Sequence, residues 1–430
     1  MKFCFSALGC KVNRFESEAL VQLAQTRGHE IVQQGADVCI MNSCTVTSSS
    51  EHKNIRAIHK MRRENPDAIL AVCGCMAQME PDRLYATGEV DLVCGTFDRA
   101  GVLDLCERYA LGREEVDTTH FRTPVPGFEQ LPPGVPQGRT RALLKVQDGC
   151  DNYCTYCIIP YARGHIRSLP VESAVRQAVH LAGQGVHEIV LTGIEISSYG
   201  RDLGADVNLH MLIEAICRAV PQTRIRLGSL EPRTADKHLC ALSQYPNLMP
   251  HFHLSLQSGC DSVLARMKRK YTTALFYENI QQLRAAFPNC SITTDLITGF
   301  PGETETEFGQ TLDFIRQCRF ADIHVFPYSS QKGTVAANMP EQLPPAVKQS
   351  RAETASHIAA QLRQEYLTGF IGQRLQVLWE HQDKEGFWCG HAPYSFIVKT
   401  KDIDCYKNQY HDAIVYAAKG DALLVHLAEA

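Results

Sequence analysis

Short apolar runs alternate with helix-like stretches along the first part of the chain. The runs KFCFSAL, DVCIMN, AILAVCG and VDLVCG end in small or polar residues, and the stretches from Ser17, Ser48 and Ala77 have helical character. This alternation predicts parallel strands joined by helices. We therefore expect residues 1–117 to form an N-terminal α/β domain with a parallel sheet.

From Leu143 the same alternation recurs six times. Strands are expected at ALLKVQ, EIVLTG, RIRLGS, HFHLSLQ, ITTDLITG and DIHVFPY, each followed by a helical stretch. Six consecutive βα units favour an open, partial (β/α)6 barrel over residues 142–369, with its site at the carboxyl ends of the strands. Residues 118–141 are rich in Pro and Gly without periodicity, which predicts a linker.

After Gly369 the pattern changes to short strands without helices. Runs such as RLQVLWE, SFIVKT and ALLVHLA predict a small β-barrel over residues 370–430. Between Gly372 and Ala430 there are six Lys plus Arg against eight Asp plus Glu, so this region is not a strongly basic RNA clamp.

Composition narrows the class of protein. The chain has 430 residues, of which 44% are hydrophobic, which indicates more than one domain. Its formal net charge of -4 means that any nucleic-acid contact requires local basic patches. No apolar run is long enough for a signal peptide or a membrane span, so we expect a cytoplasmic protein without a membrane partner. In a reducing compartment, its 18 cysteines favour metal or catalytic roles over disulfides.

Three cysteines follow the first three expected strands: Cys10, Cys44 and Cys75. Because the carboxyl ends of neighbouring parallel strands lie along one edge of a sheet, these thiols are expected to converge. The alternative is a set of unrelated loop cysteines. Cys73 precedes Cys75 on the same expected strand and is interpreted as a neighbour of the site.

Three further cysteines, Cys150, Cys154 and Cys157, lie in the stretch GCDNYCTYC after the first strand of the expected barrel. A structural zinc site is closed by four ligands, commonly from paired C-x2-C motifs. Three thiolates at C-x3-C-x2-C suit instead a [4Fe–4S] cluster in which one iron has no protein ligand. That iron is free to be chelated by a small molecule.

This pattern, with Tyr156 before the last cysteine, resembles the radical S-adenosylmethionine superfamily. The segments GCKVNRFESE, NSCTVTSSSE and VCGCMAQMEP resemble the N-terminal domain of its methylthiotransferase family, and the C-terminal region is similar to that family's TRAM domain. Within the family, GCKVN and CTVT most resemble the branch that acts on N6-threonylcarbamoyladenosine, the tRNA base just 3′ of the anticodon.

The resemblance implies a radical enzyme that inserts a methylthio group at C2 of this base in the tRNA anticodon stem-loop. The first cluster, on Cys150, Cys154 and Cys157, would bind S-adenosylmethionine and cleave it to methionine and a 5′-deoxyadenosyl radical. An auxiliary [4Fe–4S] cluster, on Cys10, Cys44 and Cys75, would deliver the sulfur. An electron donor such as flavodoxin or ferredoxin is implied as a partner.

Other candidate residues have ordinary structural alternatives. Candidate contacts to S-adenosylmethionine, which could equally be a loop aromatic and loop caps, are Tyr156, Gly193, Glu195, Ser229, Glu231 and Gln257. Candidate contacts to the RNA backbone, which could equally be solvated surface charges, are Arg163, Arg266, Lys268, Arg269 and Lys270.

Four other functions stay open at this point. The sister methylthiotransferases act on isopentenyladenosine in tRNA or on an aspartate of a ribosomal protein, and GCKVN argues against both. A non-catalytic iron–sulfur carrier needs no barrel cavity and would not cleave S-adenosylmethionine. A zinc-stabilised RNA-binding protein would be colourless, whereas a protein with two clusters, purified without oxygen, is expected to be brown.

Overall fold

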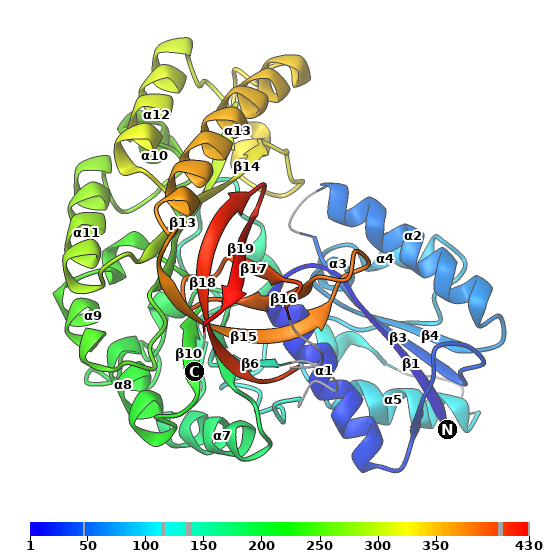
Figure 1. Ribbon diagram of the computed structural model, residues 1–430. Coiled ribbons are helices and arrows are strands. Elements are labelled where there is room, and N and C mark those ends of the chain that lie inside the picture. Colours follow the sequence, from blue (N-terminus) through cyan, green and yellow to red (C-terminus); the bar gives the residue numbers. More distant parts are fainter. Residues whose placement is uncertain (46–47, 113–116, 135–139, 403–406, 429–430) are drawn as a thin grey trace.

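The computed structural model describes residues 1–45, 48–112, 117–134, 140–402 and 407–428 (Figure 1). Three regions follow one another along the chain: an N-terminal α/β region, a central barrel of parallel strands, and a C-terminal closed barrel. The predicted α/β fold class is therefore confirmed. No helix in the described residues is long and apolar enough to cross a membrane.

The N-terminal sheet is parallel, with the strand order β2-β1-β3-β4-β5. Its strands are β1 (Lys2–Ala7), β2 (Glu30–Ile31), β3 (Val38–Ser43), β4 (Ile69–Gly74) and β5 (Leu92–Val93). The helices are α1 (Lys11–Thr26), α2 (Ser48–Glu64), α3 (Cys75–Met79), α4 (Pro81–Tyr85) and α5 (Gly101–Ala110). One face of the sheet packs on α1 and α5 and the other on α2 and α4, so both faces are buried. Two covered faces explain why these strands are almost continuously apolar.

The central barrel contains every strand expected from the sequence. The strand order is β6-β9-β10 in one sheet and β11-β12-β13-β14 in the other, all parallel. These strands are β6 (Arg141–Lys145), β9 (Glu188–Thr192), β10 (Arg224–Leu227), β11 (Ser229–Leu230), β12 (His251–Leu254), β13 (Ser291–Thr298) and β14 (Asp322–Pro327). The third expected strand is split at Gly228, which separates β10 from β11.

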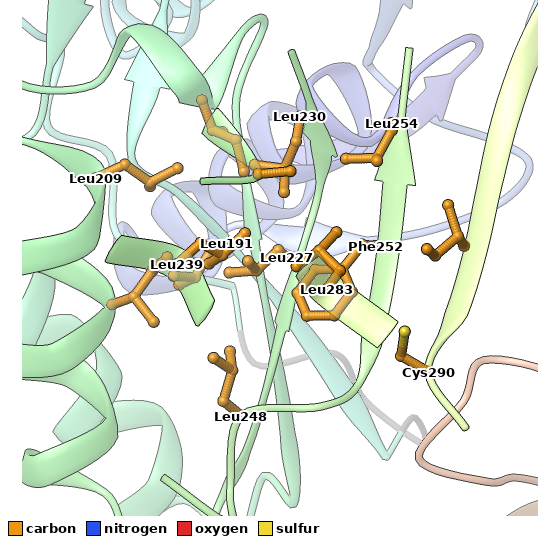
Figure 2. Close-up of a cluster of buried hydrophobic side chains, with 14 of the residues drawn as sticks. Leu191, Leu209, Leu227, Leu230, Leu239, Leu248, Phe252, Leu254, Leu283 and Cys290 are labelled. Carbon is orange, nitrogen blue, oxygen red and sulfur yellow. The ribbon is translucent and has the colours of Figure 1, made fainter. Parts of the chain in front are cut away.

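Helices cover the outside of this barrel. They are α7 (Val171–Gly183), α8 (Leu209–Ala219), α9 (Lys237–Ala241), α10 (Asp261–Arg266), α11 (Thr273–Ala286), α12 (Glu305–Cys318) and α13 (Pro345–Thr368). Leucine and phenylalanine side chains of the strands interdigitate with those of the helices, as Figure 2 shows for Leu227, Phe252, Leu254 and Leu283. This continuous core makes the barrel a rigid support for the loops at its edge.

The C-terminal strands close on themselves in the order β15-β16-β17-β19-β18. They are β15 (Arg374–Gln382), β16 (Trp388–His391), β17 (Ile397–Thr400), β18 (Tyr410–Lys419) and β19 (Ala422–Leu427). Trp379 is fully buried in this barrel, so it fills the core and is not available to stack on a base. Glu380 accepts hydrogen bonds from Arg141 and Thr140, both at 2.7 Å, which docks this barrel at the start of β6.

Part of the predicted linker packs tightly against the N-terminal region. Phe121 is fully buried in the N-terminal core, and the Arg122 carbonyl accepts a hydrogen bond from Gln78. Farther along, Glu129 accepts a hydrogen bond from the backbone N–H of Ala100. A segment without helical or strand periodicity can therefore be well packed, because its apolar side chains are few but individually buried.

Candidate active site

The first group of cysteines lies on one loop after β6. A short hairpin of β7 (Gln147–Asp148) and β8 (Arg167–Ser168) closes the base of this loop, and α6 (Ile159–Arg163) lies within it. The Cys150 N–H donates to the Gly164 carbonyl at 3.0 Å, and the Cys157 N–H donates to the Cys154 carbonyl at 2.9 Å. The loop therefore holds its three thiols by backbone hydrogen bonds.

Gly149 begins this loop and adopts a φ of +72°. A Cβ atom at this position would collide with the carbonyl oxygen of His165. Glycine is required here because the chain is both left-handed and closely approached by another backbone segment.

The loop thiols face a central cavity of about 850 Å³. Cys150, Cys154 and Cys157 all line it. Burial raises the pKa of the Cys150 thiol to about 11 and that of the Cys157 thiol to about 12. Nη1 of Arg269 lies 3.4 Å from Cys154 Sγ, so a cation faces one of the thiols directly.

The second group of cysteines lies at the carboxyl ends of three adjacent strands. Cys10 follows β1, Cys44 follows β3, and Cys75 begins α3 directly after β4. These strands are neighbours in parallel register, so their ends lie along one edge of the sheet. A Cβ atom on Gly9 would lie only 2.6 Å from Cys44 Sγ, which shows how closely the segment before Cys10 approaches Cys44.

Cys10 and Cys75 share a set of polar neighbours. Arg163 Nε donates to Cys75 Sγ at 3.4 Å, while its Nη2 donates to Asn13 Oδ1 at 2.7 Å, and that oxygen lies 4.0 Å from Cys10 Sγ. The Cys10 side chain is exposed into the central cavity that it lines, although the surrounding protein atoms raise the pKa of its thiol. Cys10 thus brings one thiol of the strand-end group to the same cavity as the loop group.

A buried charge network separates the two groups. Glu16 accepts from Arg163, from Lys145 at 2.8 Å and from Arg99 at 3.1 Å. Burial by itself would raise the pKa of Glu16, but the three cations outweigh it and hold that pKa well below its usual range. Asp148, two residues before Cys150, accepts from Lys145 at 2.6 Å.

Arg167 is a fourth cation of this network, 3.5 Å from Asp148. Four cations therefore face two carboxylates, namely Glu16 and Asp148. The excess positive charge lies beside the Cys75 thiol, which Arg163 contacts. Such an excess fits an anionic, thiolate-bound group at this position, because a buried charge needs a compensating partner.

The donor sets suit a cluster better than a single ion. In the described part of the chain, no three His, Cys, Asp or Glu side chains are grouped closely enough to hold one metal ion. Thiolates that bind an iron–sulfur cluster attach to different irons, so they do not converge on one point. Two sets of three buried or cavity-facing thiols, each beside an arginine, fit this kind of ligation.

All of the residues predicted to contact S-adenosylmethionine line the central cavity: Tyr156, Gly193, Glu195, Ser229, Glu231 and Gln257. Gly193 has no room for a Cβ atom, which would lie 2.8 Å from Ile196 Cγ2 and 2.9 Å from the Gln147 carbonyl. Glu195 accepts from the Ser197 N–H at 3.0 Å and from the Ser198 hydroxyl, and burial raises the pKa of its carboxyl.

The residues predicted to contact RNA do not form one surface. Arg163 is fully buried between the two groups of cysteines, which contradicts its interpretation as a contact to an RNA backbone. Arg269 lies in the cavity beside Cys154, and Arg266 forms an ion pair with Glu307 at 2.8 Å. Lys268 and Lys270 are exposed, and Lys270 Nζ lies 3.3 Å from Asn152 of the cysteine loop.

The sequence interpretation did not single out the polar side chains on β12, β13 and β14 that line the cavity. Asp295 accepts from His253 at 3.2 Å and from His324 at 3.4 Å. The two histidines outweigh burial and hold the pKa of Asp295 below its usual range, and hydrogen bonds to Asp295 and Asp322 raise the pKa of His324 to about 10. The alternation of polar residues in HFHLSLQ and ITTDLITG could have identified these side chains. In a barrel strand every second residue faces the interior, so residues at this spacing point to the same side.

Lys11 was also missed. Its side chain lines the cavity next to Cys10. Burial lowers the pKa of its ammonium, and the guanidinium groups of Arg226 and Arg141 lower it further, so the ammonium faces the barrel strands.

Comparison with known proteins agrees with this geometry. Residues 144–315 match the radical SAM superfamily, and residues 2–95 match the uncharacterized protein family UPF0004. Among solved structures, the radical S-adenosylmethionine methyltransferase TsrM from Kitasatospora setae matches with a TM-score of 0.58 at 15% identity, over 78% of this chain and 77% of that one. The fold and the cysteine loop thus define a radical SAM protein.

Sequence relatives narrow this class. "Threonylcarbamoyladenosine tRNA methylthiotransferase MtaB" of Bacillus subtilis is 39% identical, over 89% of this chain and 85% of the relative. The Thermotoga maritima protein of the same name is 34% identical, over 97% and 94%. "tRNA-2-methylthio-N(6)-dimethylallyladenosine synthase" of Moorella thermoacetica is 36% identical, over 87% and 86%. The chain belongs to the family of radical SAM tRNA methylthiotransferases.

Proposed function

We propose that this protein is the methylthiotransferase that modifies C2 of N6-threonylcarbamoyladenosine in tRNA. The observation that carries the proposal is one cavity lined by the three loop cysteines and by Cys10, which belongs to a second group of three cysteines at adjacent strand ends. The bacterial relatives named for this activity support it. In this proposal, residues 1–117 form the domain that holds the auxiliary cluster, and residues 118–141 link it to the next domain. Residues 142–369 form the catalytic barrel, and residues 370–430 form a TRAM-like domain.

Cys150, Cys154 and Cys157 are proposed to hold the [4Fe–4S] cluster that binds S-adenosylmethionine. When bound, this group supplies the electron that cleaves the sulfonium to methionine and a 5′-deoxyadenosyl radical. A radical is needed because the aromatic C2–H is not acidic enough for an ordinary base. The loop supplies three thiolates, and Arg269 beside Cys154 stabilises their negative charge.

Cys10, Cys44 and Cys75 are proposed to hold the auxiliary [4Fe–4S] cluster, which supplies the sulfur. Arg163 donates to Cys75, and Asn13 links this guanidinium to the Cys10 side of the site. The buried cations beside Cys75 offset the negative charge of the thiolates. Because Cys10 lines the cavity, a cluster held by these three cysteines would supply its sulfur to the same cavity that the loop cysteines line.

S-adenosylmethionine is proposed to lie along the carboxyl ends of β9 to β12. Gly193 is proposed to lie near the methionine part, since it lines the cavity and its lack of a side chain lets its backbone approach Gln147 closely. Glu195, Ser229, Glu231 and Gln257 present polar groups to the same cavity. Tyr156 packs against a cluster of apolar side chains that includes Val263 and Met267 and also lines the cavity, and it is proposed to lie near the adenine of the cofactor.

The proposed partners are the tRNA anticodon stem-loop and a small electron donor such as flavodoxin or ferredoxin, in the cytoplasm. Lys268 and Lys270 are exposed beside the mouth of the cysteine loop, where they can attract an RNA backbone without reading its sequence. Arg266 forms an ion pair with Glu307 within the protein, so we assign the RNA contact to the two lysines.

The test is a comparison of tRNA nucleosides, by mass spectrometry, from a strain that lacks the gene and from its parent. We expect the 2-methylthio derivative of N6-threonylcarbamoyladenosine to disappear and the unthiolated nucleoside to accumulate. Loss of the 2-methylthio derivative of dimethylallyladenosine would instead assign the protein to the sister activity, for which relatives 36% and 32% identical are named. If neither nucleoside changes, the tRNA proposal is wrong.

A further inference from the structure

We propose that Lys11 recognises the carboxylate of the threonylcarbamoyl group and so selects the modified adenosine that enters the cavity. This inference rests on the proposed function and names the residue by which the same cavity distinguishes its substrate from a hydrocarbon-modified adenosine.

The position of Lys11 places its side chain in the cavity that the loop cysteines also line. It is the first residue of α1 and directly follows Cys10. Its side chain lines the cavity together with Cys150, Cys154 and Cys157 of the loop. A substrate bound in this cavity can therefore be contacted by this ammonium.

The other charged side chains of the cavity have partners inside the protein. Asp295 is held by His253 and His324, Asp322 pairs with Arg363 at 2.9 Å, and Glu231 pairs with Arg233 at 2.8 Å. Arg269 contacts Cys154 and donates to the Ser255 carbonyl at 3.1 Å. Across the described ranges of the chain, Lys11 has neither an ion pair nor a side-chain hydrogen bond.

An unpaired cation in a cavity calls for an anionic ligand, because leaving it unpaired on substrate binding would be costly. The threonylcarbamoyl group ends in the carboxylate of its threonine, whereas a dimethylallyl group is a hydrocarbon. When the threonylcarbamoyl group binds in the cavity, its carboxylate pairs with Lys11. When a dimethylallyl group binds instead, the Lys11 ammonium is shielded from water without a partner, which disfavours binding.

The order of Cys10 and Lys11 also agrees with the shape of the base. On the purine ring, C2 and the carbon that carries N6 both flank N1, so the two substituents project from the same edge. Two adjacent residues at the start of α1 can therefore face the two substituents. Cys10 lies at the site that supplies sulfur to C2, and Lys11 faces the end of the N6 substituent.

The test uses a stem-loop RNA that carries threonylcarbamoyladenosine and the same RNA with the threonine carboxylate converted to its methyl ester. We expect the wild-type holoenzyme to bind the acid more tightly than the ester and to show a lower KM for it, by about 10- to 100-fold, the range of a hydrogen bond to a charged group. Lys11→Gln should bring this ratio close to one, and Lys11→Arg should restore most of it.

Arg14→Gln is the matched control, because Arg14 lies about one turn farther along α1, is half exposed and forms an ion pair with Glu18. Iron content and the absorption spectrum of each variant establish whether both clusters are present. Because the acid and the ester are compared on the same protein sample, partial loss of iron does not move the ratio.

A Lys11→Gln variant that distinguishes acid from ester as well as the wild type does would overturn the inference. So would a wild-type enzyme that thiolates the threonylcarbamoyl RNA but treats the ester equally, which leaves the proposed function intact. A wild-type enzyme that thiolates only a dimethylallyladenosine stem-loop would overturn both.

Discussion

The two groups of cysteines present the same number of thiols but are held by different means. The loop group lies within eight consecutive residues, 150–157, and backbone hydrogen bonds of the loop itself fix its thiols. The strand-end group comes from three strands, and only the parallel register of β1, β3 and β4 brings its members together. One site is therefore local and the other depends on the whole N-terminal sheet.

This difference determines what each site needs from its surroundings. The residue just before the loop is Asp148, whose partner Lys145 lies on β6 of the barrel. The strand-end site is completed by Arg163, which comes from the loop region and donates to Cys75 of the other domain. The charge network around Glu16 thus joins the two sites, and perturbing it should affect the strand-end site more strongly than the loop site.

The largest effect on stability is expected from Glu16→Gln. Removal of this carboxylate takes the shared partner away from Arg163, Lys145 and Arg99, which should lower the free energy of unfolding by about 3–5 kcal/mol. Chemical denaturation followed by circular dichroism measures the change. Asp313→Asn, on α12, removes an exposed pair with Arg316 and should cost about 0.5 kcal/mol or less. Equal losses for the two variants would contradict the assigned role of the network.

Two glycine variants, one at each site, test whether the two groups of cysteines bind their clusters independently. Gly9→Ala introduces a Cβ atom 2.5 Å from Cys44 Cβ at a φ of +104°, and Gly149→Ala introduces one against the His165 carbonyl at a φ of +72°. Each should cost about 1–3 kcal/mol locally. After anaerobic reconstitution, each variant should retain about half of the iron of the wild type, from the undisturbed site. Loss of all iron in both variants would show that the sites are not independent.

Arg269→Gln should act on the loop site alone. It removes the guanidinium 3.4 Å from Cys154 Sγ while leaving the strand-end thiols unchanged. We expect the reduction potential of the loop cluster to fall, since a cation beside the thiolates favours the more negatively charged, reduced form. Electron paramagnetic resonance during a redox titration measures this shift. The exposed Lys268 provides the control variant Lys268→Gln, for which both clusters should titrate as in the wild type.

The smallest effect is expected in the C-terminal barrel, which holds neither group of cysteines. The His391 and Arg141 side chains outweigh burial and lower the pKa of Glu380 to about 2. Because the folded-state pKa lies below the unfolded value, this carboxylate stabilises docking above pH of about 4.5 and loses that contribution as the pH falls towards about 2. Glu380→Gln should remove about 1 kcal/mol at neutral pH and flatten this acid dependence.

Limited proteolysis across this pH range reports whether the C-terminal barrel is docked. Glu385→Gln, at an exposed position of the same barrel, should behave as the wild type does. Iron content should be unchanged in both variants. A loss of iron in Glu380→Gln would mean that the C-terminal barrel supports a cluster site directly.

Much of this arrangement is readable from the sequence because it follows from local patterns. The spacing of Cys150, Cys154 and Cys157 marks the loop site, and the repeated strand–helix alternation locates every barrel strand. The strand-end site follows from topology once a parallel sheet is expected. The two-residue strand β2 was missed, because two residues are too few to show periodicity.

Residues at the boundary between domains were not predictable in the same way. Arg163 looks like a surface cation beside its loop, yet Glu16, the partner that buries it, lies 147 positions away in the sequence. Lys11 carries no pattern of its own, and it becomes notable only when the packed domains enclose a cavity in which the other charges are paired. Burial of a charged side chain depends on the partner surface, which local periodicity does not encode.

The central claim is that the loop site cleaves S-adenosylmethionine and the strand-end site supplies the sulfur. The most direct test measures 5′-deoxyadenosine formed from S-adenosylmethionine under reducing conditions. Two variants are compared: Cys10, Cys44 and Cys75 all changed to Ala, and Cys150, Cys154 and Cys157 all changed to Ala. The first should form 5′-deoxyadenosine without methylthiolating RNA, and the second should form none. Formation of 5′-deoxyadenosine by the second variant, or its absence in the first while the loop-site iron is retained, would contradict the account.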